Sequence, residues 1–406
     1  MTKFIYIFVC LLFSVNFWNL AIVPNFFKPD ILLFLSWIWI FSGIFLFNSS
    51  NRKKALNSLN YNKTVYFIFL GVFLSMFSAS AYGGQSIMTS LIAQRTIYSF
   101  MLLPAMLFVQ PTEEDIVKAL KWISIVTVIV WVLVHFNTSL IKLDKSNVEQ
   151  VELQKQDLST KLEFYVNGIH FVVLYCYIKM NEYIKSFTWK TFTEASLFLV
   201  FIILYQNRSL IMGVIPFFAY SLFKFKSSYK VYIVIVLSIL LTFAILISTD
   251  IWMSLFNKTK SNLNETDYNR WKSLAYYFNQ YSSSWYSFIF GNGFPSGGNS
   301  PLGKLMWSNF SKGIFASDLG MIGMWVDFGL IPLIAIYSIL ASIIKRVYFP
   351  LYLKFICLHI LFVPTIFKFW SNPEITFFVI IIYFHAYYSE IYKNLVYEVS
   401  NSNSKL

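Results

Sequence analysis

The stretch ILLFLSWIWIFSGIFLF, residues 31–47, contains no charged side chain and decides the class of fold. Its length lies within the range of about 17–25 residues that crosses a hydrocarbon core of about 30 Å as an α-helix. The same character continues along the 406-residue chain, in which 57% of the residues are hydrophobic and only 13% are charged. This composition is too apolar for a soluble globular protein, and it predicts an all-α polytopic integral membrane protein.

Apolar segments of this kind recur along the chain and predict about 12 transmembrane helices. The expected spans are residues 3–22, 31–47, 64–80, 91–109, 119–136, 165–180, 191–205, 209–223, 231–249, 320–344, 350–367 and 374–390. The first span follows a basic residue, as in a signal peptide, but it lacks a small-x-small cleavage site and is expected to be retained. Residues 1–406 are therefore interpreted as a single polytopic membrane domain.

The basic residues of the short loops predict the orientation of the chain. If the N-terminus is cytoplasmic, the loops after the even-numbered spans lie inside and hold most of these residues. They are Arg52, Lys53, Lys54, Lys63, Lys118, Lys185, Lys190, Lys224, Lys226, Lys230, Lys345 and Arg346. The short outside loops offer little beyond Lys28 and Lys368, so both termini are expected in the cytoplasm. The same bias accounts for the net charge of +13, and no nucleic-acid partner is expected.

Two longer segments are then predicted to face the periplasm. Residues 137–164 form the first, and residues 250–319, between spans nine and ten, form a much larger loop that we expect to bear the active site. The large loop combines aromatic side chains with the glycine-rich stretch GNGFPSGG. Trp271, Tyr277 and Trp285 are candidates for stacking against sugar rings, and an aromatic belt at the membrane interface is the alternative.

Three arginines lie on the side where the positive-inside rule makes arginine least expected. Arg95 is near the outer end of span four, Arg208 lies in the QNRS link between spans seven and eight, and Arg270 is in the large loop. Guanidinium groups suit two-pronged binding of phosphate oxygens, so these residues are candidates to bind a lipid-linked pyrophosphate. The alternative for Arg208 is a boundary residue whose side chain reaches the headgroups.

The candidate general base is Asp318, at the outer end of span ten, where it could equally cap the helix. His170, near the outer end of span six, is the second catalytic candidate, with a structural role as its alternative. Asp327 lies deeper and is expected to be paired or to line a cavity. The histidines have no ligand spacing and no nucleotide-binding motif occurs, so neither a metal nor a cofactor is expected.

The order of three motifs resembles the O-antigen polymerase and O-antigen ligase superfamily of bacterial surface-polysaccharide assembly. The motifs are QNRS between two spans, NRWKSLAYYF followed by FIFGNGF in the large loop, and SDLGMIGMWVDFGL at the next span. Ligases usually place a histidine–asparagine pair in the third motif. This chain has Ser317 and Asp318 there, which argues against a ligase.

The resemblance implies a glycosyltransferase-type polymerase of O-antigen or capsule repeat units in the bacterial inner membrane. It would transfer the growing glycan from undecaprenyl pyrophosphate to a new lipid-linked repeat unit at the periplasmic face. Expected partners are the undecaprenyl-pyrophosphate-linked oligosaccharide and membrane lipid, with a chain-length regulator and a flippase. The rival functions are an O-antigen ligase and a lipid-linked oligosaccharide flippase. A single polar outer loop is less typical of a flippase.

The orientation can be tested by labelling single cysteines introduced around Ser283 in intact cells. We expect a membrane-impermeant thiol reagent to label them from the periplasmic side, because the short lysine-bearing loops hold the other side in the cytoplasm. Labelling only after the cells are opened would contradict the orientation and the function built on it.

Overall fold

The computed structural model is all-helical over the residues that it describes, and no strand occurs among them. These residues are 2–21, 23, 29–47, 59–137, 140, 166–205, 207–224, 269–281, 284–296, 300–363 and 372–403. The ninth predicted span, residues 231–249, lies outside them, as do almost all of the first predicted periplasmic loop and the beginning of the second. Each of the other predicted spans coincides with a helix or with a pair of helices.

The helices fall into two groups along the chain. The first group is α1 (Lys3–Ser14), η1 (Asn16–Asn19), α2 (Pro29–Leu46), α4 (Leu59–Ala81), α5 (Ile87–Ala93), η2 (Arg95–Met101), α6 (Leu102–Val109), α7 (Glu113–Phe136), α9 (Ile169–Lys185), α10 (Trp189–Leu204) and α11 (Arg208–Lys224). The second group is α14 (Asn269–Tyr276), the π-turn η4 (Tyr277–Tyr281), α15 (Trp285–Phe290), α16 (Pro301–Ser311), η5 (Ala316–Leu319), α17 (Met321–Phe328), α18 (Leu330–Lys345), α19 (Leu351–Phe362) and α20 (Asn372–Asn403).

Three helices in the described part of the chain are long and apolar enough to cross a membrane. They contain residues Lys63–Ala81, Glu113–Val134 and Asn372–Tyr397, and a fourth crossing arises if the bent pair from Ile87 to Val109 is counted as one span. The other apolar helices are shorter than this criterion requires. The protein therefore has membrane-spanning character, and the total of about 12 crossings stays a prediction.

The outer surface of α4 is apolar, as expected for a helix in contact with lipid. Phe67, Leu70, Phe73 and Phe77 are all exposed on it, whereas Ile68 and Val72 are buried in the core. A row of exposed aromatic and aliphatic side chains of this length is unfavourable in water and favourable against acyl chains. The arrangement agrees with the membrane class that the composition predicts.

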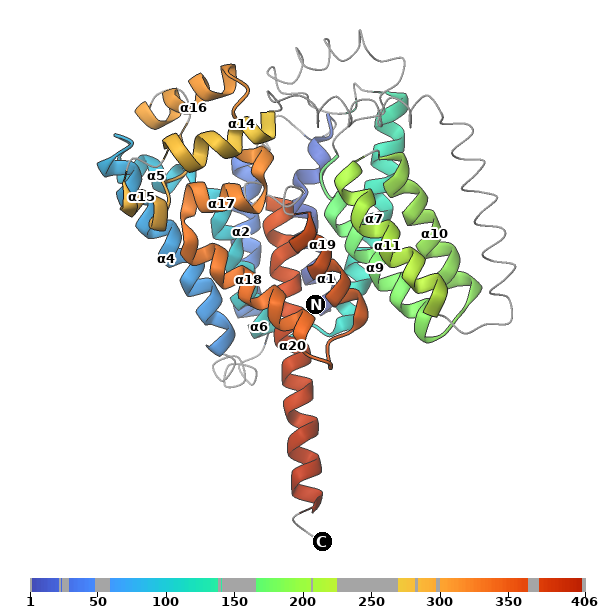
Figure 1. Cartoon of the computed structure of the whole chain (residues 1–406). Coiled ribbons are helices and arrows are strands. Elements are labelled where there is room, and N and C mark those ends of the chain that lie inside the picture. Colours follow the sequence, from blue (N-terminus) through green and yellow to red (C-terminus); the bar gives the residue numbers. More distant parts are fainter. Residues whose placement is uncertain are drawn as a thin grey trace.

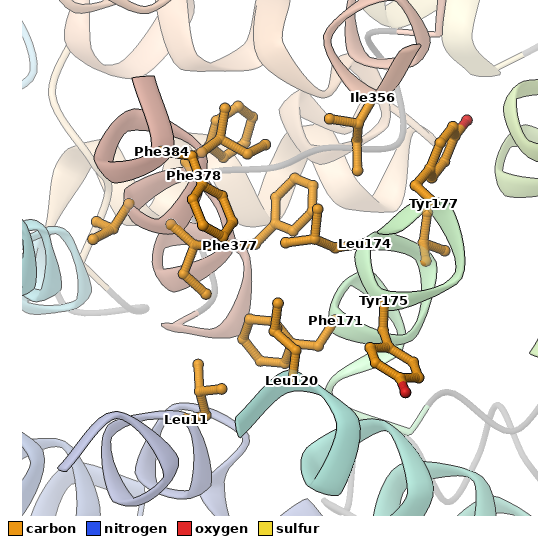
Figure 2. Close-up of a cluster of buried hydrophobic side chains, with 14 of the residues drawn as sticks. Leu11, Leu120, Phe171, Leu174, Tyr175, Tyr177, Ile356, Phe377, Phe378 and Phe384 are labelled. Carbon is orange, nitrogen blue, oxygen red and sulfur yellow. The ribbon is translucent and has the colours of Figure 1, made fainter. Parts of the chain in front are cut away.

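Helix α9 is the centre of the bundle. Most of its side chains are buried, because α7, α10, α11, α19 and α20 pack around it. Figure 2 shows Phe171, Leu174 and Tyr177 of α9 among apolar side chains from α1, α7, α19 and α20. This cluster joins segments that lie far apart in the sequence into a single core.

Loops that were predicted to be cytoplasmic meet at one end of the bundle. The Nζ of Lys3, at the start of α1, donates to the carbonyl of Gln110 at 2.7 Å, and Tyr352, at the start of α19, donates to Glu113 at 3.2 Å. The C-terminal part of α20 projects from this end, while α14, α15 and α16 lie at the opposite end (Figure 1). The predicted cytoplasmic loops and the large predicted loop thus lie at opposite ends of the bundle, as the predicted topology requires. Which end faces the cytoplasm stays a prediction.

Two of the predicted spans are not continuous helices. The span predicted at 91–109 bends by 63° between α5 and η2, and the span predicted at 320–344 is divided by Gly329 into α17 and α18. Gly329 has a φ of 83°, and a side chain there would clash with the carbonyl oxygen of Ile289 at the end of α15. A continuous helix cannot accommodate this backbone conformation, so the apolar pattern alone overestimated its length.

Replacing Gly329 by alanine is expected to destabilise the protein. A left-handed backbone costs an alanine about 1–2 kcal/mol, and the clash with Ile289 adds to that cost. The melting temperature of the purified protein in detergent, followed by size-exclusion chromatography after heating, measures the effect. Ser338→Ala, on the exposed surface of α18, is the control and should melt like the wild type. Equal melting temperatures for Gly329→Ala and the wild type would show that the contact is dispensable.

Candidate functional site

The described part of the large predicted loop folds into a cap on one end of the bundle (Figure 1). The cap comprises residues 269–281, 284–296 and 300–319, which form α14, η4, α15, α16 and η5. The Oγ of Ser273 accepts the amide proton of Phe315 at 2.9 Å, which ties α14 to the chain before η5. The indole of Trp325 donates to the carbonyl of Phe288 at 2.7 Å, which ties α17 to α15. These contacts bring the cap onto α17.

The GNGF turn, residues 291–294, docks on the end of α17. The amides of Asn292 and Gly293 donate to the carbonyls of Val326 and Asp327, both at 2.9 Å. Because the helix breaks after α17, carbonyls at its end are available to partners outside the helix. Gly291, with a φ of 84°, permits the approach, since a Cβ there would lie 2.5 Å from the carbonyl oxygen of Asp327.

A buried glutamine joins the cap to the turn after α4. Gln85 is 1% exposed, and its amide nitrogen donates to the Oγ of Ser90 and to the carbonyl of Phe294, both at 2.9 Å. Its side-chain oxygen accepts from the amide of Ser296 and from the Oγ of Ser300, both at 2.8 Å. All the strong hydrogen-bonding positions of this side chain are used, which fixes the segment that follows the GNGF turn.

The cap encloses a cavity of about 160 Å³, which we call the cap cavity. Its wall is lined by Tyr277, Tyr281, Phe294, Pro295, Met306, Asn309, Phe310, Ala316 and Asp327. The carboxylate of Asp327 comes from α17 and belongs to a residue that is only 4% exposed. Asp327, which was expected to be paired or to line a cavity, lines the cap cavity. A space of this size has room for several water molecules or for one small ring.

Tyr281 forms part of the wall of two cavities. It lines the cap cavity, and it also lines a larger cavity of about 570 Å³ beside α4, which includes Tyr276, Gln280 and Asn292. Burial raises the pKa of Tyr281 well above its usual value, and the charge of Asp327 raises it further. The phenol therefore stays protonated at neutral pH and can act as a hydrogen-bond donor to a ligand.

Arg95 has a partner in the structure. Its Nε and Nη2 donate to the same carboxylate oxygen of Asp30, at 3.0 and 2.6 Å, and its Nη1 donates to the carbonyl of Ile92 at 3.1 Å. The two side chains are 39% and 69% exposed, so the ion pair is of the surface type, which contributes about 0–1 kcal/mol to stability. A phosphate that binds the Nε and Nη2 of Arg95 must displace Asp30. The free-energy cost is small, because the ion pair is exposed to solvent.

For Arg208, Arg270 and Asp318 the structure describes the position of the backbone and not that of the side chain. Arg270 is the second residue of α14 and Asp318 lies in η5, and these two elements pack against each other. Arg208 begins α11, which packs against α9, α10 and α19. The packing thus brings the elements of Arg270 and Asp318 together, while Arg95 and Arg208 belong to other parts of the bundle.

The remaining predicted site residues differ in exposure. Tyr277 is 3% exposed and lines the cap cavity, whereas Trp271 and Trp285 are 57% and 72% exposed on the surface of the cap. His170 is the second residue of α9, and its ring lies 5.8 Å from that of Phe377. Among these four described residues, Tyr277 is the one that lines the cap cavity.

His359 has structural contacts inside the helix bundle. The hydroxyl of Tyr177 lies 3.1 Å from the Nδ1 of His359, and the Nε2 of His359 lies 3.0 Å from the carbonyl of Ser209. His359 therefore joins α9, α11 and α19. Within the described ranges, no three side chains of the types His, Cys, Asp and Glu are grouped closely enough to hold a metal ion.

Two residues important for the cap were not identified from the sequence. Gln85 lies in an ordinary polar turn, and Asn309 lies in a short segment with no recognisable motif. Gln85 bonds to residues about 200 positions away, and Asn309 lines a cavity together with residues of other helices. A local sequence pattern therefore does not indicate either role.

The sequence matches no protein-family model and no curated protein, and the fold matches no solved structure. The functional assignment therefore depends on the residues and their arrangement.

The role of Arg95 can be separated from that of its ion pair by comparing Arg95→Ala with Asp30→Ala. If Arg95 binds pyrophosphate, we expect Arg95→Ala to abolish polymer and Asp30→Ala to keep it, because removing the carboxylate leaves the guanidinium available. Polymer length on gels and protein abundance in the membrane are the measurements. Equal loss of polymer and of abundance in both variants would reduce Arg95 to a structural ion pair.

Proposed function

We propose that the protein is a polymerase of lipid-linked surface-polysaccharide repeat units. It transfers the growing glycan from undecaprenyl pyrophosphate to a new lipid-linked repeat unit at the periplasmic face of a bacterial inner membrane. The observation that carries the proposal is the cap cavity, which combines tyrosine, asparagine and aspartate side chains with aromatic rings. The cavity is lined in part by residues of α16, a helix that lies at the end of the bundle opposite the projecting part of α20 (Figure 1).

The proposed reaction is a glycosyl transfer without metal or nucleotide. The acceptor hydroxyl oxygen forms a bond to the anomeric carbon of the donor sugar, and the bond from that carbon to the pyrophosphate oxygen breaks. The hydroxyl proton passes to Asp318, with His170 as the second candidate, and undecaprenyl pyrophosphate leaves with the bonding electrons. Arg95, Arg208 and Arg270 stabilise the charge that develops on the leaving group, as pre-placed cations do.

Two features favour this reaction over its rivals. A ligase of the same superfamily would be expected to carry a histidine–asparagine pair where this chain has Ser317 and Asp318. A flippase would be expected to carry charges deep within several spans and to have short loops on both sides. Here a long outer segment instead folds into a cap that shares a small core with α17. This core consists of Tyr277, Ile314, Leu319, Trp325 and Val326.

Deleting the gene tests the assignment in cells. We expect the surface acceptor to carry single repeat units and no chains, because flipping and ligation still operate without the polymerase. A flippase defect would trap repeat units in the cytoplasm, and a ligase defect would leave long chains on the carrier lipid. Purified protein should extend undecaprenyl-pyrophosphate-linked repeats with no nucleotide and no divalent ion. Chains that persist in the deletion strain, or a requirement for ATP or a lipid-core acceptor, would show that the proposal is wrong.

Complementation with arginine variants tests the proposed charge stabilisation. Arg208→Ala should not restore chains, and Arg208→Lys should restore few, because a point charge does not reproduce the two-pronged contact of a guanidinium. Arg346→Ala is the matched control, since Arg346 lies at the other end of the bundle and donates to the Tyr348 hydroxyl at 2.7 Å. Normal chains with Arg208→Ala would leave Arg208 as a boundary residue.

A further inference from the structure

Asn309 in the cap cavity is a buried amide whose hydrogen-bonding groups are not used within the described protein. The residue is 1% exposed and lines the cavity. Neither its side-chain nitrogen nor its side-chain oxygen has a hydrogen-bond partner among the residues that the structure describes. Burying a carboxamide without partners is unfavourable, so such a group in a folded protein points to a ligand or to water.

The position of Asn309 is fixed by its own backbone. Its carbonyl accepts the amide protons of Lys312 and Ile314, at 3.0 and 2.9 Å, where α16 ends. These two bonds hold the Cα at the cavity wall. The side chain is therefore presented to the cavity by a defined turn.

The other lining residues supply groups that complement an uncharged polyhydroxyl ring. Asp327 offers a carboxylate that accepts protons from hydroxyl groups, and Tyr281 offers a phenol. Tyr277, Phe294 and the other apolar lining side chains provide surfaces for the C–H face of a sugar ring. The described lining contains no lysine, arginine or histidine, so the Asp327 carboxylate disfavours phosphate and other anions there.

We propose that the cap cavity binds one neutral pyranose unit of the glycan. Asn309 and Asp327 hydrogen-bond to its hydroxyl groups, and the aromatic rings of the wall pack against its apolar face. The inference rests on the proposed function and adds a division within it. The sugar is recognised in a cavity whose described lining contains no cationic side chain, separately from the pyrophosphate.

Binding can be measured without any polymerisation. The full-length protein in lipid nanodiscs is mixed with methyl glycosides of a hexose, an N-acetylhexosamine and a 6-deoxyhexose, and saturation-transfer NMR detects contact with the protein. At least one neutral glycoside should give a signal, while methyl glucuronide and inorganic pyrophosphate should not. Asn309→Leu and Asp327→Asn should each weaken binding of the positive glycoside at least tenfold.

Thermal stability distinguishes a ligand-binding asparagine from a structural one. Asn309→Leu should keep or raise the melting temperature, because it removes an unpartnered buried amide. Asn292→Leu is the matched comparison and should lower it, since the Asn292 side chain donates to the carbonyl of Val326 at 3.0 Å. A melting temperature that falls equally in both variants would make Asn309 structural and overturn the proposal.

Two further outcomes separate this inference from the polymerase itself. A cavity that holds only water would give no signal with any neutral glycoside, and this result would overturn the sugar site even if the protein polymerises repeat units. Glycoside binding that is lost in Asn309→Leu and in Asp327→Asn would support the sugar site even if the deletion strain shows the defect of a flippase or a ligase.

Discussion

The contact between Gly291 and the chain around Gly329 is the constraint on which the cap depends. Both residues have φ values near +84°, and a Cβ on either would clash with the backbone of the other segment. The break at Gly329 makes carbonyls of α17 available, and the amides of the GNGF turn bond to them. Two backbone segments that are distant in sequence thus satisfy each other's hydrogen bonds, and the side chains beside them, Phe294 and Asp327, become neighbours in one cavity wall.

The cap is also held from the side of α4, which makes it an integral part of the bundle. Gln85 binds three residues of the cap, Phe294, Ser296 and Ser300, through its single side chain, and Gly293 lies directly against Ala79 of α4. Since α4 also packs along α18, the cavity is supported by helices on both sides of the break at Gly329. Such support is what a binding site requires if its polar groups are to be pre-placed for a ligand.

Under the proposed function, two described regions with different polar groups would contact different parts of the substrate. The cap cavity is lined by a carboxylate, an amide and phenols, which suit hydroxyl groups. Arg95 lies elsewhere, at the bend between α5 and η2, and is only weakly engaged by Asp30.

The sequence by itself determined the helical membrane class and the positions of most helices, because apolar runs of sufficient length have few alternatives in a bilayer. It also indicated that Asp327 is paired or lines a cavity. Only the tertiary structure decided that residues 320–344 form two helices and that Arg95 pairs with Asp30. It also decided that Gln85 holds the cap and that Asn309 lines the cap cavity. The physical reason is that hydropathy reports the burial of one segment in an apolar medium. A helix break, an ion pair or an unpartnered amide instead depends on backbone and side chains contributed by distant segments, which no local pattern contains.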